Sequence, residues 1–373
     1  MTAARIGVAG PIIRDSTVQP LKGLLPHELE TLAVQEGGRP FAGRQMARWM
    51  YGRGVDAFDR MTDLPRPLRE KLAGRYRIND GKVAAELVSA DGSVKLLVEL
   101  SDGARVECVS IPEGRRTTLC VSTQAGCARA CAFCATGRAG FRRNLSAGEI
   151  VEQAVIARRR GPVTNVVFMG QGEPLDNYEN VRRAVGLLTS PLGFGIGARH
   201  VTVSTVGVVP GVIRLGEDRV RAGLTVSLSA PDDALRARLA PVAKRWPLEE
   251  LLEAVQSWRR ATRRDPTIAY VILGGVNDSS DHARRLGAIA RRIGAKVNLV
   301  PFNPARGFNP PAADAVNRFH AVLLGLGIVV LVRKPRGSDI AAACGQLAAS
   351  EPSRAEFSSP RKLHGTRLRV PGS

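Results

Sequence analysis

The amino-acid sequence predicts an α/β protein in which a small helical domain and a connecting β-hairpin precede a partial barrel of six strand–helix units. Three patterns support this prediction. Apolar residues recur at helical spacing before residue 83, two β-rich runs flank a Ser-Asp-Gly turn at 101–103, and short apolar runs alternate with amphipathic segments from residue 117 onward. Strand–helix alternation of this kind produces a parallel sheet with right-handed crossovers. A chain of 373 residues can bury one large core and a smaller one.

The N-terminal third is expected to hold the helices and the hairpin. Leu29, Trp49 and Leu72 belong to apolar series at helical spacing, with basic residues between them and Gly/Pro breaks at 37–40 and 64–67. The hairpin strands are expected at 95–100 and 105–111. The predicted division of the chain is an N-terminal extension at 1–22, a helical accessory (RNA-binding) domain at 23–82, a hairpin linker at 83–116, a barrel at 117–347 and a basic, flexible tail at 348–373.

Apolar runs mark the strands of the predicted barrel, and helices such as 147–158 and 248–260 lie between them. The predicted strands are 117–122, 164–169, 200–205, 224–228, 267–273 and 296–300, with a seventh apolar run at 328–332. In barrels of this type the functional residues lie in the loops that follow the carboxyl ends of the strands. We therefore expect chemistry in the loops after these runs.

Composition and charge narrow the partners. The chain has 54 Lys+Arg against 34 Asp+Glu, a formal net charge of +20, which favours a nucleic-acid partner. An Arg-rich composition also arises from a GC-rich genome, but that would not explain the deficit of acids. The sequence has no apolar run of membrane-spanning length and no signal-peptide pattern at its start, so no membrane association is expected. With its cysteines free, we expect a cytoplasmic protein.

Three cysteines form the most informative motif, Cys127-x3-Cys131-x2-Cys134, in the loop after the first barrel strand. Three thiolates hold an iron–sulfur cluster with one iron left open for a substrate, whereas four would fill it. Zinc is the alternative, although no His lies between Ala135 and Arg199 to serve as a further ligand. A disulfide framework is not favoured, because six cysteines in this length are sparse. With Phe133 before the last cysteine, the motif resembles that of the radical S-adenosylmethionine (SAM) enzymes.

Polar residues follow several of the other predicted strands. The segment 169–174 reads Met-Gly-Gln-Gly-Glu-Pro, in which Gly172 lets the backbone approach a ligand and Glu173 offers a carboxylate to an ammonium group. Ser204, Ser227 and Asn303 end or follow later strands. Each of these three could be an ordinary turn residue, but their shared position favours ligand contact.

Three cysteines lie outside the motif. Cys108 reads as a small buried hydrophobe. Cys120 lies in the first barrel strand, and Cys344 lies in a loop with glycine on its C-terminal side, where a reactive thiol is plausible.

Together these segments resemble the RlmN/Cfr family of RNA adenine methyltransferases, nearest to the adenine-C2 branch. The resemblance runs from about residue 40 to 347 and rests on Met61-Thr-Asp-Leu64, Cys120, the cysteine triad, Gly-Phe-Arg-Arg-Asn-Leu at 140–145, Gly-Glu-Pro at 172–174 and Ala-Cys-Gly-Gln-Leu at 343–347. It implies a [4Fe-4S] cluster on Cys127, Cys131 and Cys134, two SAM molecules per turnover, and an electron donor such as flavodoxin or ferredoxin. The implied cofactor contacts are Gly172, Glu173, Ser204, Ser227, Leu228, Ser229 and Asn303.

The same resemblance implies a reaction sequence on 23S rRNA, and possibly on tRNA. One SAM methylates Cys344, and the second yields a 5′-deoxyadenosyl radical that removes a hydrogen atom from this methyl group. The resulting methylene radical adds to an adenine carbon, Glu107 accepts the ring proton, and Cys120 attacks Cys344 to release the RNA. Without the resemblance, Glu107 would read as an exposed hairpin carboxylate.

Three positions depart from the usual family pattern. Ser229 stands where His is usual, Ala269 where an acidic residue is common, and Gln171 where Met is usual. They indicate a divergent member and leave substrate choice open. The alternatives are methylation at adenine C8, a radical SAM paralogue with another substrate, and a cluster-containing RNA-binding protein without catalysis. Retention of both Cys120 and Cys344 argues against the second of these, and intact Glu107, Glu173 and Cys344 against the third.

Overall fold

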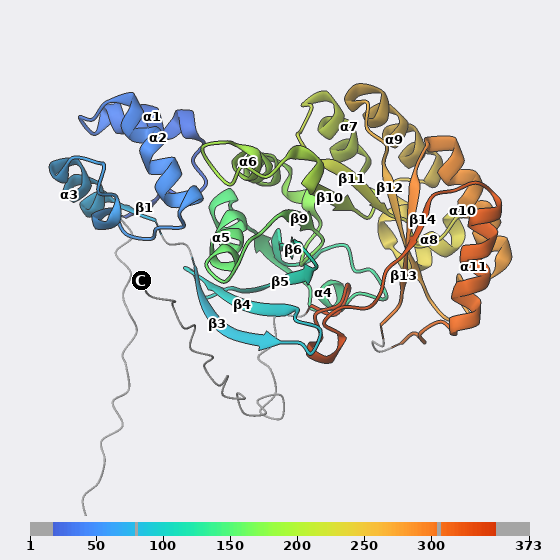
Figure 1. Cartoon of the computed structure of the whole chain (residues 1–373). Helices are drawn as coiled ribbons and strands as arrows, with labels where there is room; N and C mark the ends of the chain where they lie inside the picture. Colours follow the sequence, from blue (N-terminus) through green and yellow to red (C-terminus); the bar gives the residue numbers. More distant parts are fainter. Residues whose placement is uncertain (1–17, 79–80, 304–306, 348–373) are drawn as a thin grey trace, which may run out of the picture.

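The computed structural model describes residues 18–78, 81–303 and 307–347. The predicted tail and most of the predicted N-terminal extension lie outside these ranges. Within them, one continuous sheet has the strand order β14-β13-β12-β11-β10-β9-β6-β5-β4-β3. Neighbouring strands from β6 to β14 are parallel, and those from β3 to β6 are antiparallel. Figure 1 shows this sheet between the N-terminal helices and the outer helices of the barrel.

The parallel strands confirm the predicted incomplete barrel. Their bounds are β6 Arg116–Cys120, β9 Asn165–Phe168, β10 Val201–Thr205, β11 Gly223–Ser227, β12 Thr267–Ile272, β13 Lys296–Pro301 and β14 Val330–Val332. In the described part of the chain β14 pairs only with β13, so the sheet stays open. A short separate pair, β7 Gln124–Gly126 and β8 Phe141–Asn144, brackets the cysteine loop.

Helices cover the parallel strands in chain order. Their bounds are α4 Ala135–Arg138, α5 Ala147–Arg158, α6 Tyr178–Thr189, α7 Val209–Glu217, α8 Asp233–Leu239, α9 Leu248–Thr262, α10 Ser280–Ile293 and α11 Ala313–Gly325. Ser146 caps α5 by accepting the Glu149 N–H while the Glu149 side chain returns to the Ser146 N–H, which fixes where this helix begins. Helix α5 packs on α6, α7 on α9, and α10 on both α9 and α11, so the helices form a curved outer layer.

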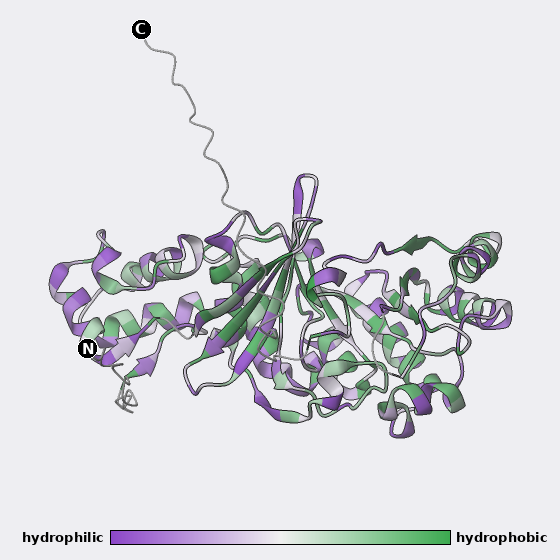
Figure 2. Cartoon of the chain, turned by 90° about the horizontal axis from the view of Figure 1, so that it is seen from below, coloured by the Kyte–Doolittle hydropathy of each residue, from purple (hydrophilic) through white to green (hydrophobic). Residues whose placement is uncertain are grey.

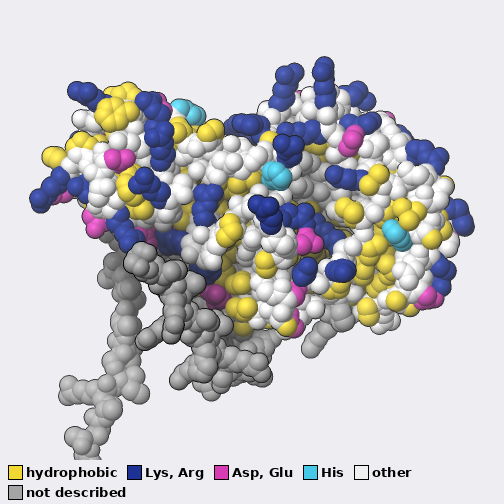
Figure 3. Space-filling model, in the orientation of Figure 1, with side chains coloured by type: hydrophobic (Ala, Val, Ile, Leu, Met, Phe, Trp, Pro, Cys, Tyr) yellow, Lys and Arg dark blue, Asp and Glu magenta, His cyan; other side chains and the backbone are white. Residues whose placement is uncertain are grey.

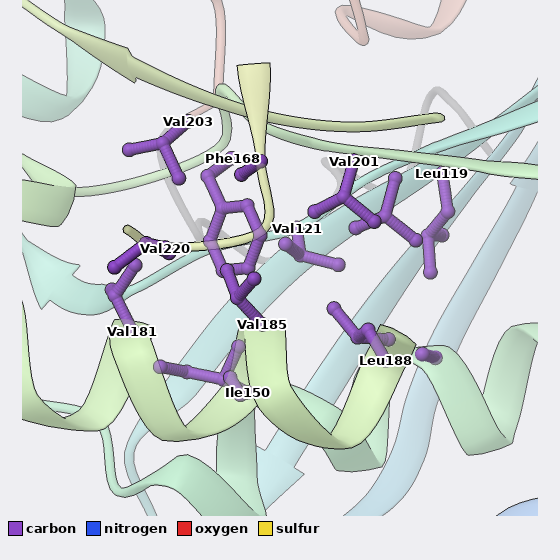
Figure 4. Packing of buried hydrophobic residues seen from close by; sticks show 14 of the residues in the cluster. Leu119, Val121, Ile150, Phe168, Val181, Val185, Leu188, Val201, Val203 and Val220 are labelled. Atoms are coloured by element: carbon purple, nitrogen blue, oxygen red, sulfur yellow. The ribbon is translucent and has the colours of Figure 1, made fainter. Parts of the chain in front are cut away.

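The core lies between this helical layer and the sheet. Phe168 of β9 and Val203 of β10 face Val181 and Val185 of α6, as Figure 4 shows. All four side chains are buried. Figure 2 shows the central strands largely in the hydrophobic colour. Most residues of the central parallel strands are buried or half-buried, so these strands read as nearly continuous apolar runs in the sequence.

The predicted hairpin consists of β4 Val94–Leu100 and β5 Arg105–Glu113, and a further strand, β3 Gly81–Val88, extends it to three strands. Strand β3 was not predicted. Its residues alternate between half-buried and exposed, and alanines occupy two of its positions, so its apolar signal is weak. Because β5 pairs with β6, the hairpin is part of the barrel sheet.

The N-terminal helices form a separate layer against α5 and α6. They are α1 Pro26–Gln35, α2 Pro40–Ala47 and α3 Arg66–Arg75, and a short parallel pair joins β1 Gln19–Pro20 to β2 Tyr76–Arg77. Among the helices in the described ranges, none has the length and apolar character needed to cross a bilayer.

One buried and one half-buried set of polar contacts join this layer to the barrel. The Lys22 ammonium pairs with the Glu152 carboxylate of α5, and both side chains are fully buried. Arg183 of α6 donates to the Glu28 carboxylate of α1 at 2.9 Å and to the Gly23 carbonyl at 3.0 Å. Removing one member of a buried ion pair leaves an uncompensated charge in the interior. The Lys22–Glu152 pair is therefore the contact whose loss should cost most.

We expect Lys22→Met to lower the free energy of unfolding by about 3–5 kcal/mol, because the Glu152 carboxylate stays buried without its cation. Chemical denaturation of the metal-free protein measures this. The control is Arg318→Met, which removes an exposed pair with Asp314 and should cost less than about 1 kcal/mol. Equal losses in the two variants would contradict the prediction.

Candidate active site

Three thiols approach one cavity from the loop between β7 and α4. Cys127, Cys131 and Cys134 all line this cavity, which lies at the carboxyl ends of the parallel strands. Burial raises the pKa of Cys127 to about 11. Burial and the neighbouring Cys134 and Cys127 thiols also raise the pKa of Cys131. The structure therefore brings the three predicted cluster ligands together.

The donor set fits an iron–sulfur cluster. Within the described ranges, no three His, Cys, Asp or Glu side chains surround the position of a single metal ion. A cubane cluster places its cysteine sulfurs on different irons, so its ligands need to line a pocket without converging on one point. The three thiols of the motif line this pocket, and as thiolates they would hold a cluster that leaves one iron open for SAM.

The loop after β9 holds a buried carboxylate at the cavity wall. Gly172 has φ +98°, and a Cβ there would lie 2.6 Å from the Gln124 Cβ, so only glycine fits. The Glu173 carboxylate accepts the Leu175 N–H at 3.0 Å and the Val206 N–H at 2.9 Å. Burial raises the pKa of Glu173 to about 7, although these hydrogen bonds favour its ionised form. Glu173 is thus held ready for a cationic or hydrogen-bond-donating ligand.

Most of the other predicted cofactor contacts also line the cavity. The Ser204 and Ser227 hydroxyls lie 3.2 Å apart at the ends of β10 and β11. Ser229 and Asn303 are nearly buried at the same wall. Leu228 does not line the cavity, because its side chain is in the hydrophobic core and its N–H donates to the Ala269 carbonyl at 3.0 Å. A ligand would therefore meet Leu228 only through its carbonyl group.

Cys344 and Cys120 are neighbours of very different exposure. Cys344 is exposed and lines the cavity, whereas Cys120, the last residue of β6, is buried against Val109, Ala342 and Leu347. Burial and the nearby Cys344 thiol raise the pKa of Cys120. All six cysteines are free thiols. Cys108 is fully buried in the core, as predicted, and burial raises its pKa to about 12.

The Cys344 loop is fastened to the cluster loop. The Ala135 N–H, one residue after Cys134, donates to the Gly345 carbonyl at 2.8 Å. The Thr136 hydroxyl donates to the Leu347 carbonyl at 2.6 Å. Gly345 has φ +83°, and a Cβ there would approach the Phe133 carbonyl oxygen to 3.4 Å. These contacts place the Cys344 loop beside the loop that carries Cys127, Cys131 and Cys134.

Glu107 is buried, contrary to the exposed hairpin carboxylate that the sequence alone suggests. It lies on β5 with 3% of its surface exposed. Its N–H donates to the Gln171 side-chain oxygen at 3.2 Å, and its carbonyl accepts the Ser122 hydroxyl at 2.6 Å. The Lys95 ammonium lies 3.1 Å from its carboxylate. Backbone and side chain of Glu107 are therefore both fixed.

The three departures from the family pattern lie close to the site. Ser229 and Ala269 line the cavity itself. Gln171 is buried, and its amide oxygen accepts the Glu107 N–H, a bond that the thioether of methionine would make only weakly. Gln171 therefore joins the loop after β9 to the strand that carries Glu107.

Sequence reasoning missed several residues of the site. Asn298 of β13 lines the cavity, and its buried amide oxygen has no hydrogen-bond partner among the residues that the structure describes. Arg129 lines the cavity as well and pairs with Asp176. Lys95 reaches Glu107 from β4. Side chains alternate between the two faces of a strand, so the position of Asn298 between apolar residues of β13 could have indicated a side chain that points into the barrel. The pairing register of the hairpin could have indicated that Lys95 and Glu107 share a face.

An open parallel sheet with a three-cysteine loop at its carboxyl edge defines a radical SAM enzyme. The model of the Radical SAM superfamily matches residues 121–286. A second model, the ribosomal RNA large subunit methyltransferase N-terminal domain, matches residues 20–78 and thus the N-terminal helices.

Known relatives specify the family. The chain is 47% identical over 350 residues to the dual-specificity RNA methyltransferase RlmN of Anaeromyxobacter dehalogenans, covering 91% of this chain and 94% of the relative. It is 45% identical to the RlmN of Geobacter sulfurreducens, covering 89% and 92%. A crystal structure of a radical SAM methyltransferase from Sphaerobacter thermophilus superposes with a TM-score of 0.85 at 42% identity, covering 89% of this chain and all of the other. The chain therefore belongs to the RlmN family of radical SAM RNA methyltransferases, as the motifs predicted.

We expect Gln171→Met to lower the free energy of unfolding by about 1–3 kcal/mol, because the buried Glu107 N–H loses its acceptor. Thermal or chemical denaturation of the metal-free protein measures this loss. Gln256→Met is the matched control, since Gln256 makes an exposed hydrogen bond to the Arg292 carbonyl. If Gln171→Met has the same free energy of unfolding as the control, the hydrogen bond between Gln171 and Glu107 does not stabilise the fold.

Proposed function

We propose that this enzyme methylates carbon C2 of an adenine in 23S rRNA, and of an adenine in tRNA, by way of a methylated Cys344. The observation that carries the proposal is the attachment of the Cys344 loop to the cluster loop, with Cys120 buried next to it. A direct methyl transfer from SAM would need neither thiol. Two thiols beside three cluster ligands suit a reaction in which sulfur carries the carbon.

Each residue then has a chemical task. When bound, the [4Fe-4S] cluster on Cys127, Cys131 and Cys134 supplies one electron that cleaves SAM into methionine and a 5′-deoxyadenosyl radical. Before this, the Cys344 thiolate takes the methyl group of a first SAM and S-adenosylhomocysteine leaves. Glu173, Ser204, Ser227, Ser229 and Asn303 line the part of the cavity that would hold SAM.

The RNA is released by the second thiol. After the 5′-deoxyadenosyl radical takes a hydrogen atom from the S-methyl group, the methylene carbon bonds to C2. Glu107 takes the C2 proton of the adduct, and the adduct also loses one electron, for which the oxidised cluster would be the acceptor when bound; together these losses restore the aromatic ring. The Cys120 sulfur then attacks the Cys344 sulfur, the carbon–sulfur bond breaks, and the carbon takes a proton to become a methyl group. A dithiol reductant regenerates both thiols, and a flavodoxin or ferredoxin supplies the cluster electron.

Charge and family support RNA as the substrate. The chain carries a formal net charge of +20, and Figure 3 shows Lys and Arg side chains over the N-terminal helices and the barrel, with few acidic ones between them. Such a surface attracts a polyanion. The relatives are called dual-specificity RNA methyltransferases, and the matching N-terminal model is that of a ribosomal RNA methyltransferase, which supports RNA as the substrate and rRNA as one target. We propose that the N-terminal helices, residues 23–82, act as the RNA-binding accessory domain.

We expect Cys120→Ala to accumulate a covalent protein–RNA adduct, because the attack that frees the RNA is lost. Cys344→Ala should form no adduct and no methyladenosine. Denaturing gels and nucleoside mass spectrometry that separates 2-methyl- from 8-methyladenosine measure both outcomes. Cys108→Ala is the control cysteine and should remain active. Free methylated RNA from Cys344→Ala would refute the methylcysteine route, and 8-methyladenosine from the unaltered enzyme would assign C8.

We expect Glu173→Gln to weaken SAM binding about tenfold or more, since a hydrogen bond to a charged group contributes about 1.5–3 kcal/mol. The pKa of Glu173 is raised to about 7, so its carboxylate becomes mostly ionised only above that pH. SAM affinity of the cluster-loaded enzyme should therefore rise between about pH 6 and pH 8, and this rise should vanish in Glu173→Gln. Equilibrium binding measures both effects. Glu179→Gln, on the exposed face of α6, is the control.

A further inference from the structure

Lys95 joins Glu107 to the loop that carries Cys344. Its ammonium lies 3.1 Å from the Glu107 carboxylate and donates to the Ala341 carbonyl at 3.3 Å. In the β4–β5 ladder Lys95 is opposite Val109 and Leu97 is opposite Glu107, so Lys95 and Glu107 are diagonal neighbours on one face of the sheet. Both side chains are almost buried, at 12% and 4% exposure.

The Ala341 carbonyl is a fixed point of the Cys344 loop. The Asp339 carboxylate accepts the Ser89 hydroxyl at 2.6 Å and the Ala90 N–H at 3.0 Å. The Asp91 carboxylate accepts the Gly337 N–H at 3.0 Å. The β3–β4 turn thus holds the loop on its N-terminal side, and Ala135 and Thr136 hold it on its C-terminal side. The position of Cys344 consequently has supports other than Lys95.

We propose that Lys95 is a positioning residue that fixes the Glu107 carboxylate relative to the Cys344 loop, so that proton acceptor and carbon-carrying sulfur reach the same adenine carbon. This inference rests on the proposed function. The proton leaves the ring carbon for the Glu107 carboxylate while its bonding electron pair stays in the ring. Since the carbon–carbon bond forms before this step, a misplaced Glu107 blocks release and leaves attachment intact.

The test compares Lys95→Met, Lys95→Gln and Lys95→Arg in the full-length, cluster-loaded enzyme with Cys120 present. Lys82→Met is the matched control, because Lys82 forms an exposed pair with Glu99 on the same hairpin. Mass spectrometry reports methylation of Cys344, denaturing gels report the covalent adduct, nucleoside analysis reports product, and thermal melting reports folding.

We expect Lys95→Met to methylate Cys344 to within about twofold of the unaltered enzyme, to lose about tenfold or more of its product rate, and to accumulate the adduct. Lys95→Gln keeps a hydrogen-bond donor for the Ala341 carbonyl but lacks the charge, and we expect the same three effects in this variant. It therefore tests the proposal even if Lys95→Met does not fold. Lys95→Arg should recover the rate to within roughly threefold, since it keeps the cation.

Two results would overturn the role of Lys95 and leave the proposed function intact. One is product formation at the unaltered rate in both Lys95→Met and Lys95→Gln. The other is loss of both Cys344 methylation and the adduct, which would mean that Lys95 positions only the Cys344 loop. An unaltered enzyme that never methylates Cys344 would overturn the proposed function, and this inference with it. The Cys344 mass distinguishes these cases.

Discussion

Two hydrogen bonds between loops at opposite ends of the barrel sequence organise this site. The Ala135 N–H and the Thr136 hydroxyl hold the carbonyls of Gly345 and Leu347. In an open sheet the first and last parallel strands do not pair with each other. These hydrogen bonds join the loops that follow those two strands. Because they begin one residue after Cys134, whatever orders the cysteine motif also positions the thiol at 344. Residues of both joined loops line the cavity, so this junction shapes part of its wall.

The second constraint is the continuity of the sheet from the barrel into the hairpin. The β5–β6 ladder ends at Val109 and Cys120, while the next residues of β5 stay paired with β4 on the other side. The Ser122 hydroxyl and the Gln171 amide take the carbonyl and N–H of Glu107 in its place. Side chains thus extend the ladder past its end and keep a buried strand satisfied. A carboxylate far from the cysteines in the sequence is thereby held as firmly as a core residue.

Much of this arrangement could be predicted from the sequence, and the features that could not be predicted have no local sequence signal. Nearly continuous apolar runs revealed the parallel strands because most of their residues are buried or half-buried. The cysteine spacing is local, so the position of its loop could be predicted. Strand β3 was not predicted, because only one of its faces is half-buried and its apolar signal is weak. Leu228 was predicted as a cofactor contact together with its neighbours, yet it follows the last residue of β11 and its side chain is in the core. Lys95 and Ala341 are 246 positions apart, and Lys22 and Glu152 are 130 apart. Only the tertiary fold brings such pairs together.

The Lys22–Glu152 pair also limits how such enzymes can be recombined. Its lysine belongs to the part matched by the N-terminal domain model, and its glutamate belongs to the barrel. A chimaera that takes its first 78 residues from a relative with an apolar side chain at position 22 would inherit a carboxylate sealed in an interface without a counter-charge. N-terminal domains can therefore be exchanged between relatives without this cost only if the residues at positions 22 and 152 are exchanged together.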